Sequence, residues 1–390
     1  MSHSAQYESH QYTYIDTASD LESFCNALGG GDFIAIDTEF LREKTYYPEL
    51  CLVQIKQGEH LACIDTIAID DLSALIALMN NQSITKVFHA AAQDMEIFVM
   101  LDKKAPAPIF DTQVAAPLLG YQEQIGYGNL VKEVLGITLA KTHTRADWSR
   151  RPIPSQQLHY ALDDVIHLED LYLKLCEKLK ARGRLEWLVP EFEDMSLMER
   201  YNKPAKHQWQ KLRAAQQMKG QQLATLQALA EWRELYARES NKPKSWVLKD
   251  DALADLAKQR PNSLKELSHV RSINSRTQEK LGEKILTVIT DAAERKPEPL
   301  PAYVKTAKPT AHQAVMTDAL TALVSAIALQ HDVNPTQLAT RKQLQSMITN
   351  GDSDAVTGWQ KAILGSTIDD FLSGKISISS NNSEVVLTKQ

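Results

Sequence analysis

The stretch FIAIDTEF (residues 33–40) begins as a buried strand and then places two acids where core residues would continue. Because side chains alternate between the two faces of a strand, Asp37 and Glu39 point the same way, about 7 Å apart along the backbone. Like charges this close raise each other's pKa unless a cation lies between them, and a hard divalent cation is the obvious candidate. For this pair taken alone, a turn cap at Asp37 and a solvent-facing Glu39 are the commoner arrangement.

A second unexplained acid lies in the segment KVFHAAAQDMEIFVML (residues 86–101), where a short strand ends near His89 and a helix follows. On that helix Asp94 falls on the apolar stripe, whereas Gln93 and Glu96 fall on the polar side. An ionised carboxylate on a packing face needs a hydrogen-bond donor, a cation or a metal-bound water. A position at the rim of the stripe, with a bond to the helix N-terminus, is an equal alternative.

The third acid lies in PSQQLHYALDDVIHLEDLYLKLCEKL (residues 154–179), which predicts one long helix over 156–182. Tyr160 and Asp164 share a face that is otherwise apolar, one turn apart. For this pair alone, a core tyrosine bonded to Asp164 is the default interpretation. A separate face, expected to be solvated despite its metal-like spacing, carries His159, Asp163, His167, Asp170 and Lys174.

Together these residues form the pattern Asp37-x-Glu39, Asp94 and Tyr160-x-x-x-Asp164. Four converging acids would neutralise two Mg²⁺ or Mn²⁺ ions. Such a pair, about 3.5–4 Å apart, promotes in-line displacement at phosphorus. The pattern therefore predicts metal-dependent hydrolysis of a phosphate ester.

These motifs resemble those of the DEDD exonucleases that have a tyrosine in the third motif, and within them the ribonuclease D family. The resemblance covers nearly the whole chain. It implies an α/β ribonuclease H-like fold and hydrolytic 3′→5′ removal of nucleoside 5′-monophosphates from RNA, with tRNA precursors as the typical substrate. The motifs, in order, are IDTEF (36–40), TYYPELCLVQI (45–55), HAAAQDMEIF (89–98), DTQ (111–113), RADWSRRP (145–152) and YALDD (160–164).

The same resemblance implies roles for the acids and the tyrosine. Asp37, Glu39 and Asp164 would hold the first metal ion. Asp37 would bridge to the second ion, which Asp94 would support directly or through water. Tyr160 would orient the attacking water.

The resemblance also implies contacts with the terminal nucleotide from the backbone around Thr38 to Phe40 and from His89. A packed histidine at the end of a strand is an equal alternative for His89. The segment KTHTRADWSRRP (residues 141–152) is basic and offers Trp148 as a stacking surface. It borders the RNA path in one interpretation and is a loop salt-bridged to the domain in the other. Asp111 is expected to be the N-cap of a helix rather than a fifth ligand.

The pattern along the chain predicts a mixed sheet flanked by helices, followed by helical modules. Both modules resemble helicase-and-RNase-D C-terminal (HRDC) modules, the second being more divergent. The expected parts are an exonuclease domain (1–195), a first HRDC-type module (205–293), a Pro-rich linker (294–311), a second module (312–378) and a flexible tail (379–390). Strands are expected at 33–40, 50–56, 61–65, 85–89 and 108–110, with an antiparallel hairpin turning at 56–60.

Composition limits the partners. The net charge of -6 argues against a wholly basic nucleic-acid binder, but residues 200–220 carry six Lys/Arg and no acids, with Tyr201 and Trp209 among them. That segment is a candidate phosphate-tracking surface. The resemblance to the ribonuclease D family implies RNA, chiefly tRNA precursors, as the partner. A DNA exonuclease of the same superfamily and a non-catalytic RNA-binding protein are the alternatives.

Other features set the expected compartment. No GxxxxGK[ST] motif occurs, so no nucleotide cofactor is expected, and the GGGD at 29–32 precedes its strand and is expected to be a turn. The four cysteines have no CxxC spacing, which suits reduced thiols. The polar start lacks the order of a signal peptide, and the chain lacks an apolar run of about 18 residues. We expect a cytoplasmic monomer without membrane contact.

Overall fold

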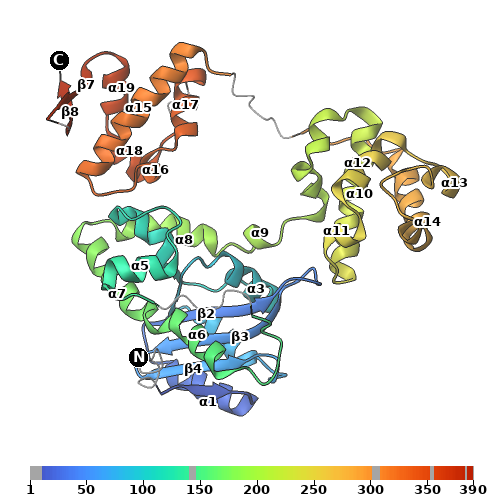
Figure 1. Cartoon of the computed structure of the whole chain (residues 1–390), viewed down its shortest axis with the longest axis horizontal. Coiled ribbons are helices and arrows are strands. Elements are labelled where there is room, and N and C mark those ends of the chain that lie inside the picture. Colours follow the sequence, from blue (N-terminus) through green and yellow to red (C-terminus); the bar gives the residue numbers. More distant parts are fainter. Residues whose placement is uncertain (1–10, 140–145, 301–307, 352–354, 383, 390) are drawn as a thin grey trace. The chain divides into compact units, whose positions relative to one another are not determined.

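The computed structural model describes residues 11–139, 146–300, 308–351, 355–382 and 384–389 (Figure 1). The chain forms two compact units. Unit 1 comprises residues 1–39, 52–197 and 305–390, and unit 2 comprises residues 40–51 and 198–304.

A six-stranded mixed sheet holds the motifs. Its order is β1 (Thr13–Ile15), β4 (His60–Asp65), β3 (Glu49–Gln57), β2 (Phe33–Leu41), β5 (Thr85–Phe88) and β6 (Ile109–Asp111). The pairs β1–β4, β2–β5 and β5–β6 are parallel. The hairpin of β3 and β4 is antiparallel with Gln57 opposite His60, as predicted, and Gly58 supplies the positive φ of +55° that its turn requires.

Helices flank this sheet, as the sequence predicts. They are α1 (Ala18–Leu28), α2 (Ser73–Asn80), α3 (Ala92–Asp102), α4 (Thr112–Ala115), α5 (Tyr127–Leu135), α6 (Ser155–Ile166), α7 (Leu168–Ala181) and α8 (Val189–Met195), with 3₁₀ helices η3 (Ala116–Leu119) and η4 (Leu185–Leu188). Buried strand residues such as Ile34 and Ile36 form the core against them.

The prediction of one unbroken helix over 156–182 is wrong, because α6 ends before His167 and α7 begins after it. The amide of His167 bonds the carbonyl of Val165. The carbonyl of Asp163, its regular helical partner, instead accepts a 3.1 Å hydrogen bond from the Tyr127 hydroxyl. A residue from another helix thus competes for the backbone bond that would have continued the helix.

The face of α6 that was expected to be solvated is also different. His159, Asp163 and His167 are half-buried, and the His159 ring meets the edge of Tyr12 at 6.0 Å. Only the α7 residues of that face, Asp170 and Lys174, are exposed. The contact of His159 with Tyr12 and the hydrogen bond from Tyr127 to the carbonyl of Asp163 are long-range contacts that the sequence pattern did not predict.

Unit 2 is helical after residue 198. It contains α9 (Met198–Tyr201), η5 (Ala205–Lys211), η6 (Arg213–Gln217), α10 (Gly220–Glu239), α11 (Lys244–Val247), α12 (Asp250–Gln259), α13 (Leu264–Leu267) and α14 (Ser275–Ala292). Trp209 is 1% exposed and lies in the core of this unit, where Tyr46 also packs. The expectation that Trp209 is part of an RNA-tracking surface is therefore wrong, because its ring is buried in the apolar core.

The C-terminal part of unit 1 contains α15 (Ala311–Gln330), α16 (Pro335–Leu338), α17 (Arg341–Asn350), α18 (Gly358–Leu364), α19 (Thr367–Leu372) and a hairpin of β7 (Ile376–Asn381) and β8 (Glu384–Lys389). The hairpin corrects the expectation of a flexible tail at 379–390. Ile378 and Leu387 face each other in its register and pack against the module's core, which orders the two strands.

Within the described residues, α15 is the one helix long and apolar enough to cross a membrane, with a mean hydropathy of 1.3 over its 18-residue window. The expectation that no apolar run of this length exists is thus corrected. Leu320 and Leu323 of α15 form the core of the C-terminal module, and Asp318 forms an ion pair with Arg341. These contacts are those of a core helix in a bundle.

The C-terminal module is anchored to the sheet-bearing part of unit 1. The rings of Trp187 and Trp359 stack with centroids 4.5 Å apart and an angle of 3°. Arg184 donates to the carbonyls of Leu118 at 2.8 Å and Asp332 at 3.1 Å. The C-terminal module therefore packs against the segment that contains Arg184 and Trp187.

Candidate active site

Strand β2 presents Asp37 and Glu39 from one rigid element. Its apolar residues Ile34 and Ile36 are fully buried, which fixes the strand in the sheet. Ligand oxygens of Asp37, Glu39 and Asp164 all lie within 4.8 Å of one another. The structure therefore brings together three of the four predicted acids, two from β2 and one from α6.

Asp94, the fourth acid, is 7% exposed on the packing face of α3. Its carboxylate accepts a hydrogen bond from the Thr38 hydroxyl, which gives it a side-chain partner on β2. Asp94 lies close enough to Asp37 and Glu39 to raise the pKa of both.

Asp111 holds the turn that leads into α3. Its carboxylate accepts hydrogen bonds from the amides of Ala90 at 3.0 Å and Ala91 at 2.8 Å, where Ala90 has a φ of +65°. It also accepts a 2.8 Å bond from the amide of Gln113 as the N-cap of α4, as predicted. Asp111 thereby places the helix that carries Asp94.

Burial and mutual repulsion raise the pKa values of the acids. Burial, followed by the charges of Asp164, Asp94 and Glu39, raises the pKa of Asp37 well above its usual range. Burial, then Asp164 and Asp94, raises the pKa of Glu39 to about 8. Burial is also the main reason why the pKa values of Asp94 and Asp164 rise to about 7.

This donor set fits divalent metal ions. Carboxylate oxygens are the ligands that Mg²⁺ and Mn²⁺ prefer. Among the described residues, no Lys, Arg or His forms an ion pair with Asp37, Glu39, Asp94 or Asp164. Asp94 is buried and the other three acids are half-buried, so a cluster of this kind without a basic partner needs another source of positive charge.

Tyr160 lies one turn before Asp164 on α6, half-buried. Burial first, then the charges of Asp164, Glu39 and Asp37, raises its pKa to about 12. Its hydroxyl therefore stays protonated near neutral pH and can hold a water molecule by a hydrogen bond, but cannot act as a base.

The contacts of His89 favour the packed histidine of the two alternatives. Its Nδ1 lies 2.9 Å from the Thr112 hydroxyl and its Nε2 lies 3.0 Å from the carbonyl oxygen of Ile125. Its ring meets Tyr127 at 5.5 Å. Burial lowers its pKa, consistent with a neutral ring.

Tyr127 is a neighbour of the site that the sequence pattern did not reveal. Its hydroxyl donates to the carbonyl of Asp163, the residue before Asp164, and burial, then the charges of Asp164 and Asp37, raises its pKa. It lies on α5, in a segment with no unexplained acid or motif. No signal in the sequence could have selected it.

The basic segment 141–152 falls partly outside the described residues, which resume at residue 146. Trp148 is 6% exposed and its ring lies nearly parallel to that of Tyr160. Arg151 forms an ion pair with Asp65 at 2.5 Å. The described part is thus a loop salt-bridged to the domain, and Trp148 is not an exposed stacking surface.

The sequence and the fold are similar to those of known proteins. A family model described as "3'-5' exonuclease" matches residues 12–180, and an HRDC domain model matches residues 222–289. Ribonuclease D of Zymomonas mobilis is 36% identical over 380 residues, which cover 96% of this chain and 97% of that protein. The chain belongs to the ribonuclease D family.

Further comparisons support this membership. Ribonuclease D of Escherichia coli is 32% identical over 93% of this chain and 98% of its own length. Its crystal structure, described as that of an exoribonuclease involved in structured RNA processing, superimposes with a TM-score of 0.79 and covers 93% of this chain and 99% of that chain. The ribonuclease H-like fold predicted from the sequence is confirmed.

Proposed function

We propose that this chain is a metal-dependent 3′→5′ exoribonuclease that releases nucleoside 5′-monophosphates from RNA. The observation that carries the proposal is the gathering of Asp37, Glu39 and Asp164 within 4.8 Å, with no basic partner among the described residues. Membership of the ribonuclease D family supports RNA as the substrate.

We assign two divalent ions, Mg²⁺ or Mn²⁺, to the four acids. Asp37, Glu39 and Asp164 would hold the first, and Asp37 and Asp94 would hold the second. When bound, such ions increase the acidity of the attacking water and neutralise charge that develops on the phosphate. The Thr38 hydroxyl, by bonding Asp94, keeps that carboxylate turned toward β2.

The reaction joins a water oxygen to the phosphorus of the last phosphodiester. It breaks the bond from phosphorus to the 3′ oxygen of the preceding nucleotide, which leaves with a proton. Tyr160 holds and orients the attacking water through its protonated hydroxyl. We assign the terminal nucleotide to the backbone around Thr38 to Phe40 and give His89 no direct part, because both its ring nitrogens have partners.

We further propose that unit 2 contacts the RNA through phosphates. Its open pocket of about 500 Å³ is lined by Lys211, Lys244 and Lys249 together with Arg233. Burial, then the charges of Lys244 and Lys203, lowers the pKa of Lys211, so these cations lie close together. Arg233 and Lys244 are paired with Asp250 and Glu234, which leaves Lys211 and Lys249 as the principal phosphate ligands. Clustered lysines of this kind favour a polyanion.

For the whole protein we propose 3′-end maturation of tRNA precursors and other small structured RNAs. We propose a cytoplasmic monomer without a nucleotide cofactor. The five parts predicted from the sequence, with the tail corrected to a hairpin, remain our proposed domain division.

The test is cleavage of matched single-stranded RNA and DNA, each labelled at the 5′ end, in Mg²⁺ and in EDTA. Stepwise shortening of RNA in Mg²⁺ alone supports the proposal. The Asp37→Asn variant should leave RNA intact, and Glu133→Gln, an exposed acid on α5, should behave as wild type. Shortening of DNA but not RNA would indicate a DNA exonuclease, and binding of RNA without shortening would indicate a non-catalytic protein.

A further inference from the structure

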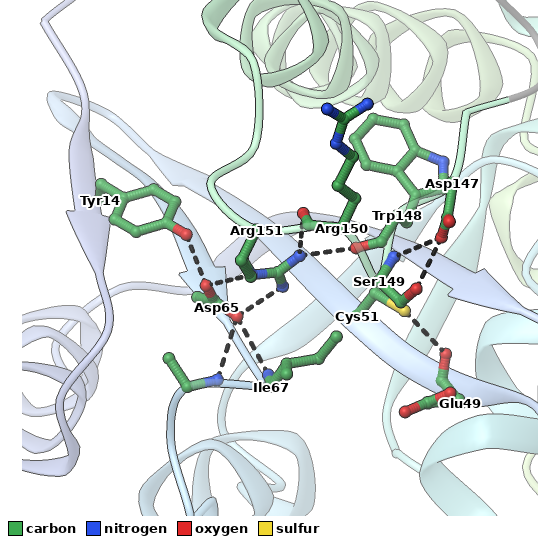
Figure 2. Close-up of polar contacts among 11 residues, drawn as sticks. Tyr14, Glu49, Cys51, Asp65, Ile67, Asp147, Trp148, Ser149, Arg150 and Arg151 are labelled. Atoms are coloured by element: carbon green, nitrogen blue, oxygen red, sulfur yellow. Dashed lines mark hydrogen bonds and ion pairs between the residues drawn. The ribbon is translucent and has the colours of Figure 1, made fainter.

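Asp65 and Arg151 form an ion pair that includes none of the four acids; Figure 2 shows the pair and its hydrogen-bond partners. The Asp65 side chain, at the end of β4, is 3% exposed, and that of Arg151 is 23% exposed. Nε and Nη2 of Arg151 donate to the two carboxylate oxygens at 2.5 Å each. The Tyr14 hydroxyl donates at 2.5 Å, and the amides of Ile67 and Ala68 donate at 3.1 Å each. A two-pronged pair with this many donors is a rigid anchor.

The remaining nitrogen of Arg151 holds the loop that precedes α6. Nη1 donates to the carbonyl of Trp148 at 2.7 Å and to that of Arg150 at 3.1 Å, as Figure 2 shows. The Trp148 indole is buried, and its ring lies at 25° to that of Tyr160 with centroids 6.4 Å apart. A series of interactions therefore links Asp65 to Arg151, Arg151 to the Trp148 backbone, and the Trp148 ring to that of Tyr160.

The orientation of the Tyr160 ring matters because its hydroxyl is at the far end of a long side chain. The half-buried ring lies nearly parallel to that of Trp148, and the Trp148 backbone carbonyl is held by the guanidinium of Arg151, which is itself bound to Asp65 on the sheet. A misplacement of about 1 Å at a reacting group can reduce a rate by about 100-fold. Loss of the support from Trp148 should therefore lower the rate measurably.

We propose that Asp65 and Arg151 are positioning residues for hydrolysis, which act through Trp148 to fix the Tyr160 hydroxyl against the attacking water. The proposal rests on the function proposed above. It assigns a purpose to the RADWSRRP motif other than contact with RNA.

The charge state of the pair suits this purpose. Burial alone would raise the pKa of Asp65, but the hydrogen bonds from Arg151, Tyr14 and the amide of Ala68 lower it. The carboxylate therefore stays ionised across the neutral range, and Arg151 is always charged. The pair should hold Trp148 equally well at every pH at which the enzyme works.

The decisive experiment is a double-mutant cycle between Arg151→Lys and Tyr160→Phe, in which kcat and KM are measured by steady-state cleavage of RNA. This substitution keeps the positive charge but removes the planar guanidinium, which donates two parallel hydrogen bonds to the Asp65 carboxylate. In the wild-type background, Arg151→Lys should reduce kcat about tenfold, leave KM within about twofold and leave the shape of the pH profile unchanged. In the Tyr160→Phe background, it should reduce the rate less than twofold, because no hydroxyl remains to be positioned.

Two outcomes would overturn the proposal. An equal loss of rate in both backgrounds would mean that Arg151 acts on the site by another route, and a rise in KM at constant kcat would mean that it binds RNA. Complete inactivity of wild-type enzyme toward RNA would instead refute the proposed function. The two failures are therefore distinguishable.

A matched control separates positioning from general destabilisation. Glu169→Gln weakens the ion pair between Lys56 and Glu169. The Lys56 Nζ lies 2.8 Å from the Glu169 carboxylate, and each of the two side chains is 16% exposed. This substitution should lower the melting temperature to a similar extent and leave kcat within about twofold. If Arg151→Lys fails to fold, Tyr14→Phe removes one 2.5 Å bond to Asp65 and should show a smaller loss with the same dependence on Tyr160. An additive loss for Tyr14→Phe would count against the proposal.

Discussion

Replacement of Glu39 by glutamine should stabilise the metal-free protein while it abolishes catalysis. Burial, then the charges of Asp164 and Asp94, raises the pKa of Glu39 to about 8, against 4.5 for an ordinary glutamate. At about pH 7.5 the unfolded chain ionises this group fully. Folding must therefore either bury the charge or take up a proton.

The magnitude follows from the two pKa values. Each pKa unit corresponds to about 1.4 kcal/mol, so the three units between 4.5 and about pH 7.5 cost the folded state about 4 kcal/mol. A buried glutamine amide retains a desolvation cost of about 2 kcal/mol. Glu39→Gln should thus gain about 2 kcal/mol, which raises the melting temperature by about 4–8 °C for a unit of this size.

The sign of the pH dependence provides a second check. A raised pKa means that the folded protein holds an extra proton between pH 4.5 and about 8, so its free energy of unfolding falls as pH rises through this window. The advantage of Glu39→Gln over wild type should therefore shrink to within about 1 kcal/mol of zero at about pH 5.

Thermal denaturation in EDTA and in Mn²⁺, at both pH values, measures these effects. Wild type should gain stability from Mn²⁺, whereas Glu39→Gln, which has lost a ligand, should gain much less, so that the order of the two proteins reverses. Glu133→Gln serves as the control for removal of an exposed charge. A Glu39→Gln protein that melts no higher than wild type in EDTA at about pH 7.5, or that responds equally to Mn²⁺, would refute the reasoning.

Three further changes test other parts of the structure. Asp37→Asn should reduce turnover below detection without loss of metal-free stability or RNA binding, as measured by calorimetry and filter binding; a large drop in melting temperature would contradict this. Tyr160→Phe should reduce kcat by about 10–100-fold with little change in RNA affinity, and equal losses in both would make it a packing residue. Glu234 is 1% exposed, and its carboxylate pairs with Arg238 at 3.0 Å and Lys244 at 3.1 Å. Glu234→Gln removes this charge and should lower the free energy of unfolding of unit 2 by about 2 kcal/mol, as measured by denaturant unfolding. Because the pKa of Glu234 is lowered, this difference should be full above about pH 4.5 and decline as pH falls through the folded value.

Much of the site was predictable because its signal is local. A strand of period two that ends in Asp37-x-Glu39, and two helices with Asp94 and Asp164 on apolar faces, are anomalies that the sequence displays directly. The hairpin at Gly58 was predictable for the same reason. Local geometry and short-range periodicity decide these features.

The predictions of secondary structure were wrong where a residue far away in the sequence forms a hydrogen bond or packs against the segment. The helix over 156–182 breaks because Tyr127 takes the carbonyl of Asp163. The tail forms strands because Ile378 and Leu387 pack on a core. None of these partners is adjacent in the sequence, so no window of local pattern contains the deciding contact.

The sequence by itself determined the chemistry available to this protein: four acids that burial does not explain, a tyrosine beside the last, and their order along the chain. Only the tertiary structure decided how these groups are supported. The contacts of Asp65 with Arg151 join residues 86 positions apart, and the burial of Trp148 against Tyr160 turns an apparent RNA-stacking residue into a support. Propensity and periodicity describe which face of an element is apolar, but which residue meets that face depends on long-range packing.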